Sequence, residues 1–210
     1  MDARRAAQVM AALHTLYPEA KPELHFRNPF ETLIATILSA QCTDKRVNLV
    51  TEKLFPLYPD AFAMAKLTPE ELEPLIRECG HYRSKAKNIV AACRALVEQY
   101  DGRVPDTRKA LMALPGVGQK TAGVVLLAAF GDNQIPVDTH VFRVARRIGL
   151  ADANTPEKVE AQLRAILDQD IWSLGHHLII WHGRRCCHAR KPECEQCPLN
   201  GGLCEKHLEN

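Results

Sequence analysis

One stretch of the sequence decides the fold: Leu114-Pro115-Gly116-Val117-Gly118-Gln119-Lys120-Thr121. It joins two segments, 107–113 and 119–130, whose apolar residues recur at spacings of three and four, as they do in amphipathic helices. Its two glycines permit a tight turn and a close approach of the backbone to another molecule. The stretch therefore predicts two helices joined by a hairpin.

The rest of the chain repeats the helical spacing. Two helix starts are marked clearly, because Thr68-Pro69-Glu70-Glu71 and Thr155-Pro156-Glu157 each place a capping threonine before a proline. We find no alternating strand pattern and no internal repeat, and we expect an all-α protein. The predicted helices cover residues 2–16, 30–39, 44–58, 69–79, 83–100, 107–113, 119–130, 139–147, 156–167 and 171–182.

Composition sets broad limits. The 210 residues include 27 Lys and Arg against 25 Asp and Glu, a net charge of +2, with 46% hydrophobic residues. These values exclude a disordered or fibrous chain and a histone-like coat of positive charge. The longest strongly apolar run, Ala122 to Phe130, is too short to span a bilayer, and the first residues do not resemble a signal peptide. We expect a protein of the reducing cytoplasm, built as one large domain or two small lobes.

The cysteines are concentrated near the end of the chain. Five of the eight lie in the last 25 positions, and four of these form the pattern Cys187-x6-Cys194-x2-Cys197-x6-Cys204. Four clustered thiolates repel one another unless a cation compensates them, and either zinc or a [4Fe–4S] cluster meets that need. Zinc ribbons usually carry two Cys-x2-Cys pairs and this segment has one, which favours iron–sulfur. The adjacent Cys186 competes with Cys187 as the first ligand.

The hairpin is also a candidate anion site. Backbone N–H groups that point out of such a turn, at the start of a helix, bind a phosphate without reading sequence. The simpler interpretation is an ordinary turn between two helices. Lys120 follows in the first turn of the second helix, where the helix dipole and an expected partial burial favour its neutral, nucleophilic form. A lysine here is otherwise a solvated charge, so a role as nucleophile requires a partner.

Asp138 is the candidate partner. It precedes the helix that begins at Thr139 and is expected to cap it. A capping carboxylate is held rigid and ionised, and those properties also suit a group that stabilises developing positive charge. For His140 three roles remain open: a phosphate contact, a core histidine or a general base.

Together these residues resemble the endonuclease III family, DNA glycosylases with abasic-site lyase activity in the helix-hairpin-helix superfamily. The resemblance implies two all-α lobes with DNA bound between them. Residues 22–132 would form a helical barrel with the hairpin, and 1–21 with 133–210 a second lobe holding a [4Fe–4S] cluster. The similar stretches are Pro29-Phe30-Glu31, Leu38-Ser39-Ala40-Gln41, Leu114 to Lys120, Val137 to Arg143, His182-Gly183-Arg184 and the cysteine cluster.

The resemblance also implies the chemistry. Lys120 would be the nucleophile and Asp138 its essential carboxylate, in an enzyme of base excision repair. It would remove oxidised pyrimidines of the thymine glycol type from double-stranded DNA, through a lysine Schiff base and β-elimination 3′ of the abasic site. A monomer associated with the nucleoid, without a membrane partner, is implied. The cluster ligands would be Cys187, Cys194, Cys197 and Cys204.

The sequence departs from the family pattern at two places, one in a DNA contact and one in the cysteine cluster. His81 stands where the family usually has an aliphatic residue that enters the DNA helix. Six residues precede Cys204 where the family has five, and Gly201-Gly202 is expected to absorb the extra residue. The full set of DNA contacts is Gln41, which would fill the space of the flipped base, with His81, Gly116, Gly118, His140, Arg190 and Lys191.

Two alternatives remain. One is an adenine-specific or thymine-specific mismatch glycosylase of the same superfamily, many of which lack the hairpin lysine. The other is a non-catalytic DNA-binding or redox-sensing module, for which loss of Lys120 or Asp138 would be the sign. Both residues are present, which is against the non-catalytic module. The presence of Lys120, and an end six residues after Cys204 where the adenine-specific enzyme has a long further domain, favour the bifunctional enzyme.

Overall fold

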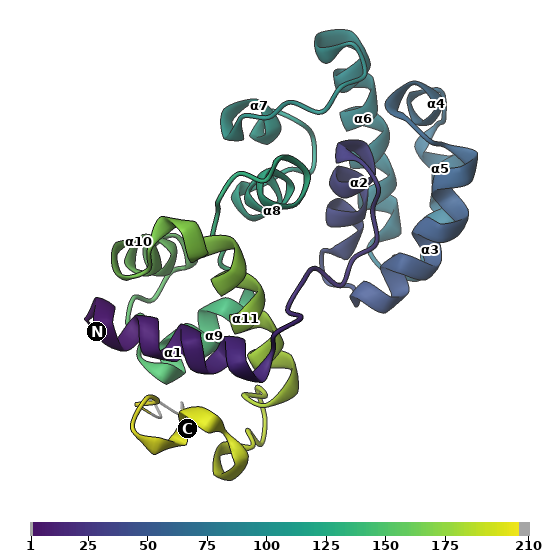
Figure 1. Cartoon of the computed structure of the whole chain (residues 1–210). Coiled ribbons are helices and arrows are strands. Elements are labelled where there is room, and N and C mark those ends of the chain that lie inside the picture. Colours follow the sequence, from purple (N-terminus) through teal and green to yellow (C-terminus); the bar gives the residue numbers. More distant parts are fainter. Residues whose placement is uncertain (1, 206–210) are drawn as a thin grey trace. The chain divides into compact units, whose positions relative to one another are not determined.

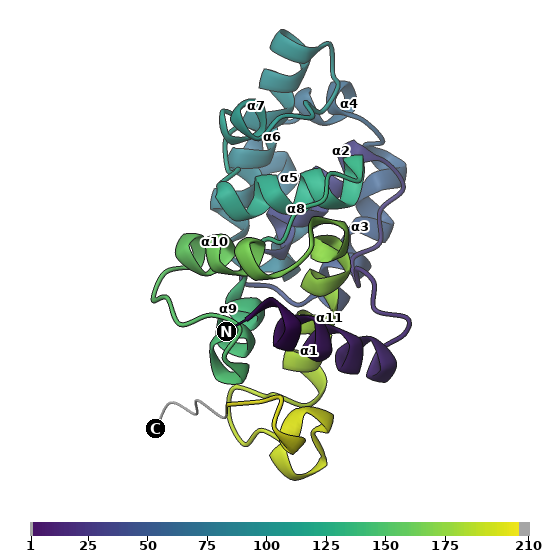
Figure 2. The same ribbon diagram turned by 60° about the vertical axis from the view of Figure 1, so that its left-hand side comes forward.

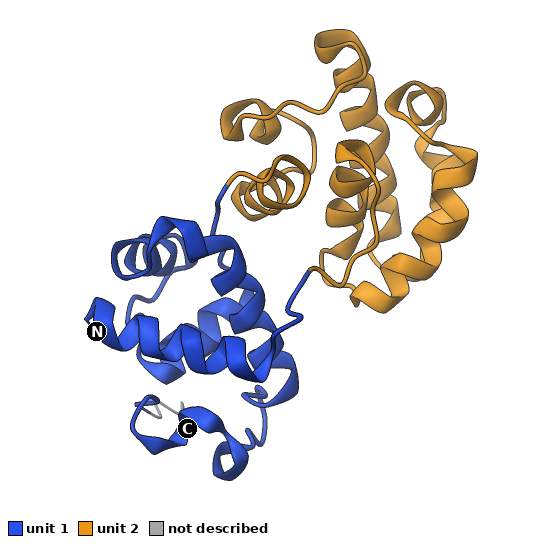
Figure 3. Cartoon of the chain, in the orientation of Figure 1, with its two compact units in different colours: residues 1–21, 133–210 blue, residues 22–132 orange. Residues whose placement is uncertain are grey.

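A computed structural model describes residues 2–205, and in this range the secondary structure is helical, without a β-strand. The chain divides into two compact units (Figure 3): unit 1 comprises 1–21 and 133–210, and unit 2 comprises 22–132. The helical secondary structure confirms the all-α fold class that was expected from the helical spacing. No helix among the described residues is long and apolar enough to cross a membrane.

Unit 2 is a bundle around one apolar core. In it α2 packs against α8, α3 and α6, while α6 also packs against α4 and α5 (Figures 1 and 2). The core includes Leu33, Ile34, Leu54 and Ile89, all with less than 2% of their surface exposed. The elements are α2 (Pro29–Ser39), α3 (Asp44–Leu57), α4 (Ala61–Ala65), α5 (Pro69–Ile76), η1 (Arg77–Cys79), α6 (Tyr82–Tyr100), α7 (Arg108–Met112) and α8 (Gln119–Phe130).

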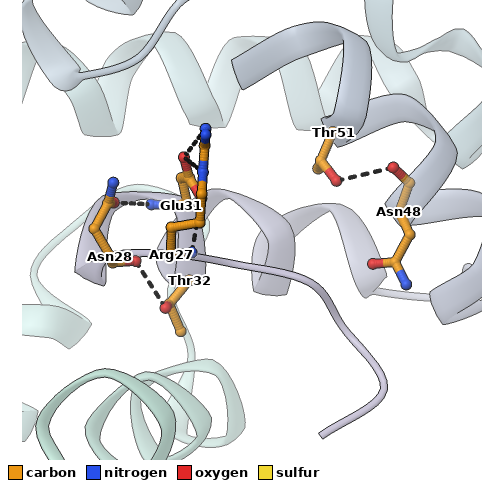
Figure 4. Close-up of polar contacts among 6 residues, drawn as sticks. All are labelled: Arg27, Asn28, Glu31, Thr32, Asn48 and Thr51. Carbon is orange, nitrogen blue, oxygen red and sulfur yellow. Dashed lines mark hydrogen bonds and ion pairs between the residues drawn. The ribbon is translucent and has the colours of Figure 1, made fainter. Parts of the chain in front are cut away.

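The start of α2 is fixed by polar contacts (Figure 4). Asn28 caps the helix by accepting a hydrogen bond from the backbone N–H of Glu31 at 2.9 Å. The Glu31 side chain is only 2% exposed, and it pairs with the Arg27 guanidinium at 2.6 Å. Asn48 of α3 joins the preceding segment to α3, because its side chain accepts from the N–H of His25 and donates to the carbonyl of Glu23, each at 2.9 Å. These contacts hold the chain as it enters unit 2.

Unit 1 has a separate core. In it α9 packs against α11 and α10, while α1 packs against α11 and η4. Leu13, Ile135, Val144 and Ile179 are fully buried there. The elements are α1 (Ala3–Leu16), α9 (Thr139–Ile148), α10 (Pro156–Ile166), η2 (Gln169–Ile171), α11 (Trp172–Arg185), η3 (Cys194–Gln196) and η4 (Pro198–Gly201). Residues from both ends of the chain thus form the core of unit 1.

Candidate active site and cysteine pocket

The hairpin between α7 and α8 is anchored in the core of unit 2. Leu114 and Val117 of the turn are buried in the core of unit 2, whereas Gly116 and Gly118 are exposed. Gly116 has φ +79°, and a Cβ atom there would lie 2.8 Å from Cβ of Asn88, so the turn requires glycine. Gly118 is the N-cap of α8 and has no side chain to cap it. The residues at the start of α8, Gly118 to Lys120, are exposed, as an anion site requires.

Lys120 is the second residue of α8 and is exposed. The expectation of partial burial was therefore wrong. The buried face of α8 begins at Ala122 and continues through Gly123 and Val125, so Lys120 precedes the part of the helix that packs on the core. Its position in the first turn of α8, at the positive end of the helix dipole, is as expected.

Asp138 caps α9, as expected. Its Oδ1 accepts hydrogen bonds from the backbone N–H groups of His140 and Val141, both at 2.8 Å. Val137 and Val141 on either side are buried, and they fix the backbone from which the half-buried carboxylate projects. The carboxylate is thus held rigidly by two backbone donors.

His140 is half-buried in the first turn of α9. Burial lowers its pKa, although the nearby Asp138 carboxylate acts in the opposite direction. Its Nδ1 lies 3.3 Å from a guanidinium nitrogen of Arg143. Burial thus favours the neutral form of the imidazole, which lies beside the guanidinium of Arg143.

Two arginines of α9 hold the loop that follows α11. Arg143 donates to the carbonyls of Gly183 and Cys187 at 2.9 and 3.1 Å, and Arg147 donates to the carbonyl of His188 at 2.6 Å. Arg147 also lies 3.9 Å from Cys187 Sγ. Neither arginine was predicted to have a role, and their spacing of four residues on one helix was the only available signal.

The four cysteines of the pattern line one small pocket of unit 1. Cys187, Cys194, Cys197 and Cys204 all contribute to its wall, together with Arg147. Burial is the main cause that raises the pKa of the Cys187 thiol, and the adjacent Arg147 opposes that rise. Four thiols around one space, with an arginine to balance thiolate charge, fit a four-cysteine cluster.

Cys186 also lines this pocket, and it is buried. Ligand atoms of Cys186, His182 and Cys197 all lie within 4.8 Å of one another. His182 Nε2 is 3.6 Å from Cys197 Sγ, and His182 Nδ1 is 3.3 Å from the hydroxyl oxygen of Tyr17. Cys197 is thus shared between the expected ligand set and a second group of donors, which sequence spacing did not reveal.

The expected DNA contacts fall into both units. Gln41 and His81 of unit 2 are exposed and have positive φ angles of 53° and 45°. Arg190 and Lys191 of unit 1 are exposed in the loop between Cys187 and Cys194. At the other end of the cluster Gly202 has φ +106° and ends η4, so the chain turns within the longer spacing before Cys204.

Comparisons with known proteins agree over nearly the whole chain. Residues 34–169 match the HhH-GPD superfamily of base excision DNA repair proteins, and residues 187–204 match the iron-sulfur binding domain of endonuclease III. Endonuclease III of Synechocystis sp. is 48% identical, covering 93% of this chain and 90% of the relative. Endonuclease III of Escherichia coli K12 is 45% identical, covering 98% and 97%.

One similar solved structure is described as a trapped endonuclease III–DNA covalent intermediate, in an estranged-adenine complex. It superimposes with a TM-score of 0.94 at 44% identity, covering 98% of this chain and 97% of the other. The second match to a family begins at Cys187 and ends at Cys204, the outer members of the cysteine pattern.

Proposed function

The chain belongs to the endonuclease III family of the HhH-GPD superfamily, and from this membership we propose roles for its individual residues. The protein is a base excision repair enzyme that acts on DNA as both glycosylase and abasic-site lyase, and it carries an iron–sulfur cluster. The non-catalytic alternative and the zinc alternative are therefore set aside. We infer the substrate class, the residues of the reaction and the DNA contacts.

The proposed substrate is double-stranded DNA with an oxidised pyrimidine of the thymine glycol type. A stacked base shields its sugar C1′, so the damaged nucleotide must leave the helix before a side chain reaches that atom. Gln41 and His81 are proposed to enter the space it leaves. Both project from short turns of unit 2 and are exposed, as such a role requires.

Lys120 is proposed as the nucleophile. Its neutral Nζ forms a bond to C1′ as the bond to the base breaks, and the base leaves with the electron pair and takes up a proton. Ring opening of the sugar gives an imine between Nζ and C1′. The imine acidifies the C2′ proton, whose removal expels the 3′ phosphate by β-elimination, and water then releases the lysine. The exposed position of Lys120, directly after the hairpin, supports this assignment.

Asp138 is proposed to stabilise the cationic sugar and to assist deprotonation of Lys120. Two backbone N–H groups hold its carboxylate, so little reorganisation is needed when positive charge develops. Lys120 belongs to unit 2 and Asp138 to unit 1. His140 is proposed to contact a phosphate from the same end of α9.

The grip on DNA is proposed to be largely independent of sequence. The N–H groups at Gly116 and Gly118 would bind one phosphate, and Arg190 and Lys191 others. Cys187, Cys194, Cys197 and Cys204 would hold the cluster, which when bound ties the loop carrying the two basic residues to unit 1. We propose that the enzyme acts as a monomer, on nucleoid DNA in the cytoplasm.

The observation that carries the proposal is the exposed Lys120 at the start of α8. Borohydride reduces a lysine–sugar imine to a stable bond, so it should trap this protein on duplex DNA that contains an abasic site. Lys120→Gln should abolish trapping. Lys53→Gln, at an exposed lysine of α3, is the matched control and should trap like the unmodified protein. Persistent trapping by Lys120→Gln would remove Lys120 from the role.

A further inference from the structure

Lys85 is a buried lysine that the mechanism does not use. It lies in the first turn of α6 and is only 6% exposed. Its Nζ donates to two backbone carbonyls, those of Leu38 and Cys79, both at 2.8 Å. Burial lowers the pKa of Lys85, and the thiols of Cys79 and Cys42 act in the opposite direction. A methionine would fill a similar volume without the cost of burying an amine, so the lysine contributes directed hydrogen bonds.

Both acceptor carbonyls lie at helix ends. Leu38 is the penultimate residue of α2, and Cys79 is the last residue of η1. Carbonyls in these positions have no partner within their own helix, and they mark the negative end of the helix dipole. One amino group therefore satisfies the ends of two different elements and holds them together.

The two residues proposed to enter the DNA helix lie shortly after these carbonyls in the sequence. Gln41 is three residues after Leu38, and His81 is two residues after Cys79. Both have positive φ angles, a conformation that costs a residue other than glycine free energy and persists only where the surroundings enforce it. The carbonyl of His81 accepts from the backbone N–H of Lys85 at 3.0 Å, in the first turn of α6, so the His81 turn is continuous with the helix that carries Lys85.

We propose that Lys85 is a positioning residue that sets the two turns carrying Gln41 and His81 at a fixed separation, so that both side chains enter the DNA helix together. The inference rests on the proposed function of those two residues in filling the helix. Loss of Lys85 should slow the extrusion of a damaged nucleotide and leave the chemistry at Lys120 intact.

The test separates extrusion from chemistry with two substrates. The first is a duplex with thymine glycol, fully paired, where the nucleotide must be extruded. The second is an abasic site opposite a one-nucleotide gap, where no base is extruded and no partner base is displaced. In single-turnover reactions Lys85→Met should slow the first on the order of tenfold, the effect of one relaxed strained turn, and should change the second less than about threefold.

Matched variants distinguish the possible failures. Cys93→Ala is a control for stability, because it removes a fully buried side chain two turns further along α6. A general loss of stability would slow the reactions of both substrates, in Cys93→Ala and in Lys85→Met alike. If Lys85→Met does not fold, it is replaced by Lys85→Gln, whose amide nitrogen lies one bond nearer the backbone than the lysine Nζ. Lys85→Gln should also slow only the paired substrate, by a smaller factor. Equal slowing of both substrates, or of neither, would overturn the proposal.

Gln41→Ala and His81→Ala test the premise. Each should slow the reaction of the paired substrate. When Lys85→Met is added to the variant that carries both alanines, the rate should fall little further, because the side chains that Lys85 positions are already gone. If neither alanine variant slows the paired substrate, the assignment of Gln41 and His81 fails, and the role of Lys85 fails with it. If both slow it and Lys85→Met does not, only the role of Lys85 is wrong.

Discussion

Oδ1 of Asp138 accepts a hydrogen bond from the backbone N–H of His140 at 2.8 Å. The same oxygen accepts from Val141, so the carboxylate proposed for catalysis also builds the first turn of α9. The two roles place different demands on the side chain. Capping needs only an oxygen acceptor, whereas stabilisation of a cationic sugar needs a negative charge.

Asp138→Asn should separate the two roles. The amide oxygen still accepts both hydrogen bonds, so the free energy of unfolding should change by less than about 0.5 kcal/mol. The single-turnover rate of base excision should fall by roughly 10²–10³, because the charge is lost. Asp138→Ala should lose a further ~1 kcal/mol of stability with the cap. Chemical denaturation and excision of thymine glycol measure the two effects, and a fully active Asp138→Asn would leave only the cap.

The hairpin glycines should respond differently to alanine. Gly116→Ala places a Cβ atom 2.8 Å from Cβ of Asn88 at a positive φ, and it should destabilise the protein by about 1–3 kcal/mol. Gly118 has φ −93° and open space around it, so Gly118→Ala should cost less than about 1 kcal/mol. Its methyl group would nevertheless obstruct a phosphate. Fluorescence anisotropy should show a Kd several-fold higher for duplex DNA, and an unchanged Kd would exclude the phosphate contact.

Local patterns predicted most of the helices, for reasons visible in single residues. Thr68 and Glu71 form the expected reciprocal cap, with the Thr68 N–H donating to Glu71 at 2.8 Å. The short helix α4 was not predicted. With five residues it is too short to display a helical period, and only Ala61 and Met64 are buried.

The site was predictable where its residues are near one another in sequence. The four-cysteine spacing and the cap at Asp138 are local patterns. The carbonyl partners of Arg143 lie 40 and 44 residues away, and one partner of Lys85 lies 47 residues away. Every residue has a backbone carbonyl, so a contact with a carbonyl does not depend on the type of residue and leaves no signal in the sequence. The exposure of Lys120 also depends on where packing begins along α8, which the apolar run did not specify.

The adjacent cysteines of the pocket should differ in their effect on the cluster. Cys187→Ser should lose most of the roughly four iron atoms per chain, together with the broad visible absorption. Cys186→Ser should retain both, because Cys186 lies outside the proposed ligand set although its ligand atom is within 4.8 Å of that of Cys197. Iron and sulfide are measured on protein purified without oxygen. Iron loss in Cys186→Ser alone would make Cys186 the first ligand.

A histidine of α11 should make stability depend on pH. Burial, with the adjacent His176 contributing, lowers the pKa of His177 from 6.5 to about 3. The unfolded chain therefore takes up the proton first as the pH falls. The contribution of His177 to stability is complete above pH ~6.5 and is lost progressively between that value and about 3. At pH 5.5 the loss should be about 1.4 kcal/mol, because that pH is one unit below the unfolded pKa.

His177→Gln should remove this part of the pH dependence. The thermal midpoint of the unmodified protein should fall by roughly 4 °C more than that of the variant between pH 7.5 and 5.5, as 1.4 kcal/mol implies for a chain of this length. Differential scanning fluorimetry at the two pH values measures the difference. His14→Gln, at an exposed histidine of α1, is the control and should follow the unmodified protein. Equal falls for His177→Gln and His14→Gln would show that His177 is protonated in the folded protein as readily as in the unfolded chain.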